Sequence, residues 1–214
     1  MLARIQDLLS AIYDLAPAPD VEAFICDREL VDATVGEGAV ERGEVLLVLE
    51  DEAGVHVALY LDPAVIEALR EAHPEWCVES RDFSARCLAT EGISHFLYLS
   101  FRADHDEQVT QLELELQAEV DKYAAGLLAG NGVGAIRERS RALRERLYDR
   151  PRFLDHADSV EGERYRVAHR AAATYAASLE ERFVETGRLG DLEVELRRFY
   201  RLGGQAKLRW IRRT

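Results

Sequence analysis

The hydrophobic and polar positions follow different periods before and after residue 104. Five apolar residues between Leu2 and Leu15 recur at helical spacing, and the APAP stretch that follows predicts where this first helix ends. Residues 21–26 (VEAFIC) predict a short strand. The glycine-rich and charged residues 32–43 predict a loop. This part of the chain therefore predicts a helix, a strand and a loop, in that order.

Residues 44–61 form the clearest unit of the sequence. Val45–Leu49 is a continuous apolar run, which is typical of a strand buried on both faces. After the turn EDEAG, apolar residues alternate with other residues up to Leu61. The pattern predicts a β-hairpin with an interior first strand and a more exposed second strand. Asp62 and Pro63 then supply the N-cap and first-turn proline of a short helix.

Cys87, Glu91 and His95 are spaced four residues apart and are open to two interpretations. A helix would place them on one face, with neighbouring Cβ atoms about 6 Å apart, where they could ligate one metal or form a polar cluster. A strand would separate Glu91 from His95 by about 13 Å. Gly92 favours a break, and ISHFLYLSF alternates well. We therefore expect a helix over 83–91 and a strand over 93–101.

The chemistry of this row is also open. Glu91 and His95 are expected to lie near one another without sharing a metal. A satisfied structural pair accounts for them better, and a catalytic or ligand-binding role is the alternative that makes them candidate catalytic residues. A zincin motif would need two histidines at fixed spacing on one helix, and the row has one.

The region after Asp104 and Asp106 has helical periodicity throughout. Apolar stripes occupy residues 112–127, 136–147, 160–186 and 189–210, and the last two predict an antiparallel helix pair. The fold class is therefore α+β. An N-terminal region, 1–103, contains a mixed or antiparallel sheet with short helices and the central hairpin. A helical region, 104–214, either forms a separate domain or packs on the sheet within one domain.

Four polar segments of the helical region receive conservative interpretations. Glu115 and Glu119 share a predicted helix face, which we expect to be solvated or packed on arginine-rich helices. GNGVGA (130–135) matches a dinucleotide fingerprint formally, but it follows a helical pattern and predicts an interhelix loop. The histidines of DHD (104–106) and DHAD (155–158) lie among aspartates that could suit a divalent metal, although helix capping accounts for them better.

Composition and charge limit the class of protein. Three cysteines without a CxxC pair argue against a disulfide framework, and Asp7 and Asp14 argue against a signal peptide, so we expect a cytoplasmic protein. Lys122 and Lys207 are the only lysines, an arginine bias typical of GC-rich bacterial genomes. No apolar run approaches the roughly 20 residues that span a bilayer.

The charges divide the chain unevenly. The net charge is −13. Residues 1–136 contain 8 basic and 27 acidic residues (net −19), whereas residues 137–214 contain 19 basic and 13 acidic residues (net +6). Such asymmetry is typical of two surfaces with different partners, and docking of the basic half on the acidic half is the alternative.

The basic C-terminus supplies the candidate binding residues. The arginines that lie off its apolar stripe are Arg197, Arg201, Arg209 and Arg213. Its aromatic residues could stack on nucleic-acid bases, but Phe199 and Trp210 fall on the apolar stripe, and the acidic half would repel a polyanion.

We therefore expect a binding or regulatory module that acts through protein–protein interaction, with an acidic N-terminal and a basic C-terminal surface. A small molecule is the alternative ligand, and nucleic acid is a less favoured partner of the basic end. The rival class is a hydrolase-type enzyme that uses Glu91 and His95, with Glu115 or Glu119 as further acids. No metal or other cofactor is expected.

Overall fold

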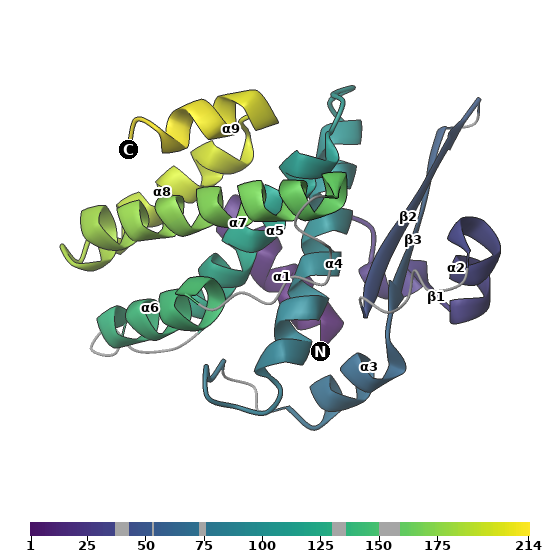
Figure 1. Ribbon diagram of the computed structural model, residues 1–214, viewed down its shortest axis with the longest axis horizontal. Helices are drawn as coiled ribbons and strands as arrows, with labels where there is room; N and C mark the ends of the chain where they lie inside the picture. The colour runs from purple at the N-terminus through teal and green to yellow at the C-terminus, as the bar shows by residue number, and fades with distance from the viewer. Residues whose placement is uncertain (37–42, 53, 73–75, 130–135, 150–158) are drawn as a thin grey trace.

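The structure is a computed structural model that describes residues 1–36, 43–52, 54–72, 76–129, 136–149 and 159–214. It has an α+β fold, in which a small three-stranded sheet lies beside a body of helices (Figure 1). The elements in chain order are α1 (Leu2–Tyr13), the 3₁₀ helix η1 (Val21–Phe24), β1 (Ile25–Cys26), α2 (Arg28–Val35), β2 (Glu44–Asp51), β3 (Gly54–Leu61), α3 (Pro63–Arg70), α4 (Phe83–Ala103), α5 (Gln111–Leu128), α6 (Ile136–Arg144), the π-helical turn η4 (Glu145–Asp149), α7 (Val160–Leu179), the π-helical turn η5 (Glu180–Val184), α8 (Leu189–Tyr200) and α9 (Gly204–Ile211).

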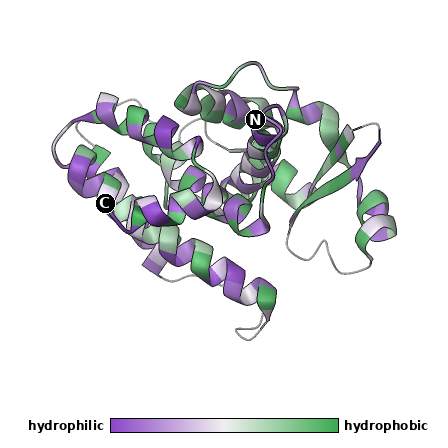
Figure 2. Cartoon of the chain, turned by 90° about the horizontal axis from the view of Figure 1, so that it is seen from above, coloured by the Kyte–Doolittle hydropathy of each residue, from purple (hydrophilic) through white to green (hydrophobic). Residues whose placement is uncertain are grey.

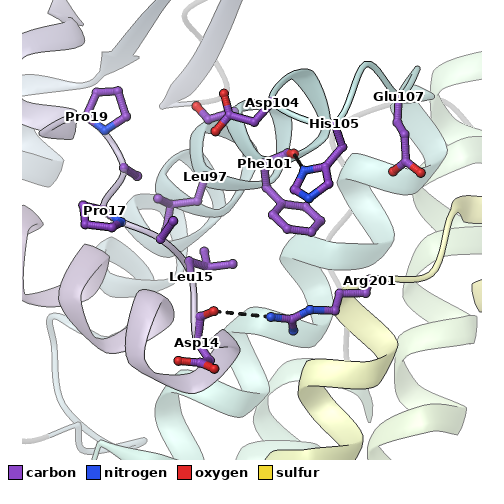
Figure 3. A pocket seen from close by; sticks show the side chains of 13 residues that line it. Asp14, Leu15, Pro17, Pro19, Leu97, Phe101, Asp104, His105, Glu107 and Arg201 are labelled. Carbon is purple, nitrogen blue, oxygen red and sulfur yellow. Dashed lines mark hydrogen bonds between the residues drawn. The ribbon is translucent and has the colours of Figure 1, made fainter.

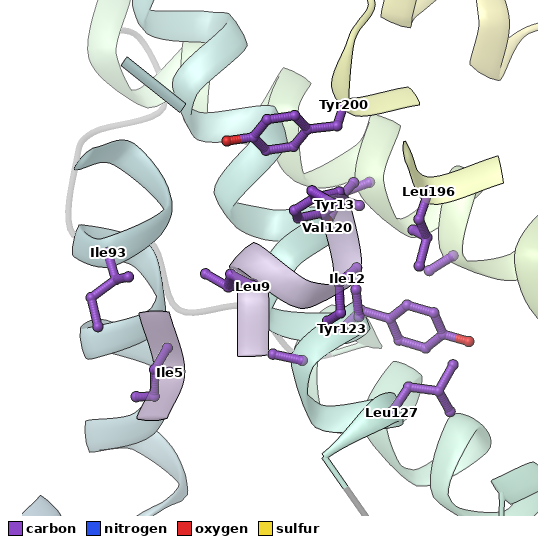
Figure 4. Close-up of a cluster of buried hydrophobic side chains, with 14 of the residues drawn as sticks. Ile5, Leu9, Ile12, Tyr13, Ile93, Val120, Tyr123, Leu127, Leu196 and Tyr200 are labelled. Atoms are coloured by element: carbon purple, nitrogen blue, oxygen red, sulfur yellow. The ribbon is translucent and has the colours of Figure 1, made fainter. Parts of the chain in front are cut away.

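The central element of the body is α5, which packs against α4 and against α7. Its predicted apolar stripe is confirmed, because Leu116, Val120, Tyr123 and Leu127 are all buried. Figure 4 shows three of these side chains beside residues of α1 and α8. The main hydrophobic cluster thus contains residues from both predicted regions of the chain.

The polar side of α5 is buried as well. Its buried polar residues are Glu113, Glu115, Gln117, Asp121 and Lys122. The solvated acidic face expected for this helix is therefore wrong for Glu115. The periodicity of α5 did reveal one apolar stripe, but neighbours cover the helix on its polar side too.

The predicted hairpin is confirmed, but its strands have the opposite roles. β3 is the central strand, since it pairs antiparallel with β2 (Leu47↔Ala58) and parallel with β1 (Ile25↔Leu59). β2 lies at the edge, and its second half is exposed. The expected interior position of Val45–Leu49 is therefore wrong. The strand predicted over 21–26 is confirmed only at Ile25–Cys26, and the residues before it form η1.

The break expected at Gly92 is also wrong, because α4 runs uninterrupted from Phe83 to Ala103. No strand forms over 93–101, and the alternation there arises in a helix whose residues Ile93–Tyr98 are all buried. Gly92 is required by close packing. A Cβ atom on it would lie 2.8 Å from Leu59 Cδ1 and 2.9 Å from Glu44 Cγ. The glycine therefore lets α4 approach the sheet.

The helix expected over 189–210 is divided into α8 and α9 at Gly203. Added Cβ atoms at this turn would lie 3.2 Å from Arg102 Nη2 at Gly203 and 3.0 Å from Glu113 Oε2 at Gly204. The two glycines therefore bring the turn close to α4 and α5. The predicted motif at 130–135 and the DHAD segment lie outside the described residues, as does half of the predicted loop 32–43. The loop is wrong for residues 32–35, which belong to α2.

Candidate functional site

The predicted row on α4 leads into a buried ionic cluster at the root of the hairpin. We define the His95 cluster as His95 of α4, Glu44 of β2 and Glu115 of α5. His95 Nδ1 lies 3.5 Å from Glu44 Oε1, and Nε2 lies 3.9 Å from Glu115 Oε2. All three side chains are buried. Because α4 is continuous, Glu91 lies one helical turn before His95 on the same face.

A second ionic cluster continues from Glu91. Lys122 Nζ donates hydrogen bonds to Glu91 Oε2 at 3.0 Å and to Glu119 Oε1 at 2.5 Å. The His169 ring of α7 lies 3.3 Å from the other oxygen of Glu119. This Lys122 cluster joins α4, α5 and α7. His169 is its member from the C-terminal half, so the contact of His169 with Glu119 joins a basic residue of that half to an acidic residue of the N-terminal half.

The two clusters shift the pKa values of Glu115 and Glu119 in opposite directions. Burial lowers the pKa of His95, but Glu44, Glu115 and Glu91 outweigh burial and raise that pKa to about 9. Burial raises the pKa of Glu115 to about 7 in spite of the attraction of His95. Burial also opposes ionisation of Glu119, yet Lys122 and His169 lower its pKa to about 2. The His95 imidazole is therefore doubly protonated and positively charged at neutral pH.

The geometry limits the enzymatic role predicted for Glu91 and His95. Glu91 is bound to Lys122, and His95 is enclosed by carboxylates. Burial raises the pKa of the Cys87 thiol to about 12, so this third member of the row is a poor nucleophile. Among the described residues, no group of three or more His, Cys, Asp or Glu side chains is placed to hold a metal ion.

A third polar network in the core was missed by the sequence analysis. Asp121 accepts hydrogen bonds from Tyr13, from Ser94 Oγ at 2.6 Å and from Gln117 Nε2 at 2.7 Å, and Lys207 Nζ donates to Gln117 Oε1 at 2.5 Å. Burial lowers the pKa of Lys207 to about 7. The spacing of Gln117 and Asp121 on α5 was visible in the sequence. Their partners come from three other elements, namely α1, α4 and α9.

Two of the four predicted binding arginines hold the fold together. Arg197 Nε donates to the Ile12 carbonyl at 3.0 Å, and Arg201 Nη1 donates to the Tyr13 carbonyl at 3.1 Å. Both arginines thereby satisfy carbonyl groups at the C-terminal end of α1. Arg209 and Arg213 are exposed.

Trp210 behaves as the packing residue that its position on the apolar stripe predicted. Its Nε1 donates to Glu195 Oε1 at 2.7 Å, and the Arg198 guanidinium lies 4.0 Å from the ring centroid. The side chain is partly buried against the main core. With its edge bonded and one face covered, this aromatic residue is poorly placed to stack on a nucleic-acid base.

The exposed apolar residues gather on the sheet and on α2. Of the seven large hydrophobic residues described as exposed, five lie there, namely Leu30, Val35, Val48, Leu49 and Val55. The remaining two, Val160 and Val194, lie on different helices. Figure 2 shows hydrophobic residues running along both strands of the hairpin, which lies at one end of the molecule.

Comparisons with protein-family models, with curated proteins and with solved structures find no match to this chain. No helix in the described part of the chain is long and apolar enough to cross a membrane.

Proposed function

We propose that the protein is a cytoplasmic protein-binding module that takes up an extended, basic segment of its partner along the outer edge of β2. The observation that carries the proposal is an edge strand with apolar residues exposed on both of its faces and exposed acidic residues at its outer end. This surface corresponds to the acidic N-terminal surface expected from the sequence. Arg209 and Arg213 mark the second, basic surface.

The backbone of β2 supplies the binding groups. β2 pairs with β3 along one edge, and no strand among the described residues pairs with its other edge. A free edge presents unpaired N–H and C=O groups to which an extended peptide can add as a further strand. Val48 and Leu49 are consecutive and therefore project to opposite faces. Apolar side chains of an added strand would find a neighbour on each face.

Charge indicates the chemistry of the partner. Glu44 at the start of β2 is buried beside His95, whereas β2 ends with the exposed residues Glu50 and Asp51, and Glu52 follows in the turn. Lysine or arginine opposite these residues would form favourable cross-strand pairs, whereas like charges would repel. The outer half of this edge therefore favours a basic segment.

The His95 cluster supports this proposal by fixing the root of the hairpin. Glu44 is the first residue of β2, and its carboxylate lies beside His95 in the core. Buried charged groups that interact from three elements restrict how those elements can move relative to one another. The start of the hairpin is thus fixed to α4 and α5. A fixed hairpin loses less conformational entropy when a partner binds.

Two extended peptides test the proposal. One alternates valine and threonine between flanking arginines, and the other carries glutamates in place of the arginines. The protein should bind the arginine peptide, with an affinity that falls as salt increases, because exposed charges are screened within about 8 Å at physiological ionic strength. Equal binding of both peptides, or binding of neither, would contradict the proposal.

A matched pair of variants locates the site. Leu49 and Val194 are each 63% exposed, but Leu49 lies on β2 and Val194 on α8. Leu49→Arg should weaken binding of the arginine peptide about tenfold, equivalent to about 1.4 kcal/mol. Val194→Arg should leave it unchanged, and neither variant should lower the melting temperature appreciably because both positions face solvent. A similar loss in both variants would place the binding site elsewhere.

A further inference from the structure

A pocket of about 440 Å³ lies between the segment that follows α1 and the C-terminal end of α4. This volume is within the range of small-molecule sites, roughly 300–1,000 Å³. Figure 3 shows Leu97 and Phe101 of α4 facing Leu15 and Pro17, with Asp104 above these apolar residues and Arg201 below them. The pocket therefore has an apolar middle with a carboxylate on one side and a guanidinium on the other.

The guanidinium of Arg201 has N–H donors that make no hydrogen bond within the described residues. An arginine has five N–H donors. Arg201 uses three, since Nη1 donates to the Tyr13 and Arg197 carbonyls and Nη2 donates to the Asp14 carbonyl at 3.3 Å. No ion pair joins Arg201 to a carboxylate among the described residues. Two donors, including Nε–H, are left for an anion, and a guanidinium binds a carboxylate especially well through two parallel hydrogen bonds.

The carboxylate of Asp104 has no cationic partner among the residues that the structure describes. Its position at the end of α4 favours binding of a cation. Asp104 is the C-cap of α4. The C-terminal end of a helix carries a partial negative charge, so an acidic side chain there is unfavourable and a cation is attracted. The neighbouring Glu107 is paired with Arg102 at 2.6 Å, which leaves Asp104 as the exposed negative group of this wall.

We propose that this pocket binds a small zwitterion whose ammonium and carboxylate groups are separated by an apolar chain. The carboxylate lies on the Nε–H edge of Arg201, and the ammonium group lies against Asp104. The apolar chain covers Leu97 and Phe101. Figure 3 shows Asp104 and Arg201 on opposite sides of Leu97 and Phe101, so the two charges of the ligand must be held apart by its chain. An α-amino acid, with both charges on one carbon, is too short to reach both ends.

Four compounds separate the contributions to binding. ε-Aminocaproate carries both charges and the chain, caproate lacks the ammonium group, hexylamine lacks the carboxylate, and L-leucine carries both charges on one carbon. Titration calorimetry and NMR shift mapping on the full chain should show ε-aminocaproate binding about tenfold more tightly than each of the other three. The shifts should centre on Leu97 and Phe101. Equal binding of caproate or hexylamine, or no binding of ε-aminocaproate, would overturn the proposal.

Arg201 and Arg197 provide a matched pair of variants, because both bind carbonyls at the end of α1 and only Arg201 lines the pocket. Arg201→Gln should weaken binding of ε-aminocaproate about tenfold, whereas Arg197→Gln should change it less than about twofold. Asp104→Asn should reduce the preference for ε-aminocaproate over caproate without lowering stability. Should Arg201→Gln fail to fold, Asp104→Asn decides: an unchanged preference in that variant would overturn the proposal.

Discussion

Replacement of Gly92 by alanine probes the contact between α4 and the sheet. In an exposed helix the change would stabilise the protein by about 1 kcal/mol, because alanine has the higher helix propensity. Here the added Cβ would lie 2.8 Å from Leu59 Cδ1 and 2.9 Å from Glu44 Cγ. Carbon atoms pack favourably at about 3.5–4.0 Å. Either α4 or these two side chains must therefore move by more than half an ångström.

The size of the effect follows from these opposing contributions. Overpacking of a well-packed core costs roughly 1–3 kcal/mol. Leu59 is fully buried and Glu44 is held beside His95, so neither side chain can move away freely. After the gain in propensity is subtracted, Gly92→Ala should lower the free energy of unfolding by about 1 kcal/mol. For a chain of this size the melting temperature should fall by about 2–4 °C.

Thermal and guanidinium denaturation measure this difference, and Gly190→Ala is the control. Gly190 lies in the first turn of α8 with no heavy atom within 4 Å of an added Cβ, so its replacement should be neutral or slightly stabilising. An NMR titration adds a second readout, since displacement of Glu44 from His95 should lower the pKa of the imidazole. A Gly92→Ala protein as stable as the parent would refute the close contact.

Three further substitutions test other parts of the structure. The His95 imidazole has a folded pKa of about 9 against 6.5 when unperturbed. It therefore contributes stability that is fully present below pH 6.5 and lost as the pH rises through about 9. His95→Gln should be less stable than the parent by about 3 kcal/mol at pH 6, and a gap in the free energy of unfolding that stays constant to pH 10 would contradict this. Trp210→Ala should lower stability by roughly 3 kcal/mol; an unchanged melting curve with loss of nucleic-acid binding would identify a stacking residue instead. Leu47→Asp, which places a carboxylate against Val31 and Tyr60, should cost several kcal/mol and lower solubility, and a melting temperature close to that of the parent would contradict the packing of α2 on the sheet.

The sequence was sufficient to predict those helices and strands that are determined by residues close together along the chain. Asp62 and Pro63 predicted the start of α3, and Asp62 Oδ1 does accept a hydrogen bond from the Ala64 amide at 2.8 Å. The turn after Asp51 predicted the hairpin. The N-terminal helix followed from its apolar spacing. In each case the residues that determine the structure are neighbours along the chain.

The errors arose where distant segments determine the structure. β3 is central because Ile25–Cys26 pairs with it in parallel, and a two-residue strand has no periodicity of its own. From the sequence alone, a glycine such as Gly92 indicates a helix end. Only its close contact with Leu59 explains why this glycine lies inside a helix. The partners of Glu91 and His95 come from α5 and β2. The spacing of Glu91 and His95 could suggest a pair of polar residues, but not the ionic clusters that surround them.

Amide hydrogen exchange of the full chain, with and without the arginine peptide, tests the proposed function most directly. If the peptide adds to the sheet, amides of β2 that face the free edge become hydrogen-bonded and exchange more slowly. We expect new protection within Glu44–Asp51, reduced in Leu49→Arg and retained in Val194→Arg. New protection in α8 and α9 alone, or none in β2 under conditions where the peptide is bound, would contradict the proposed function.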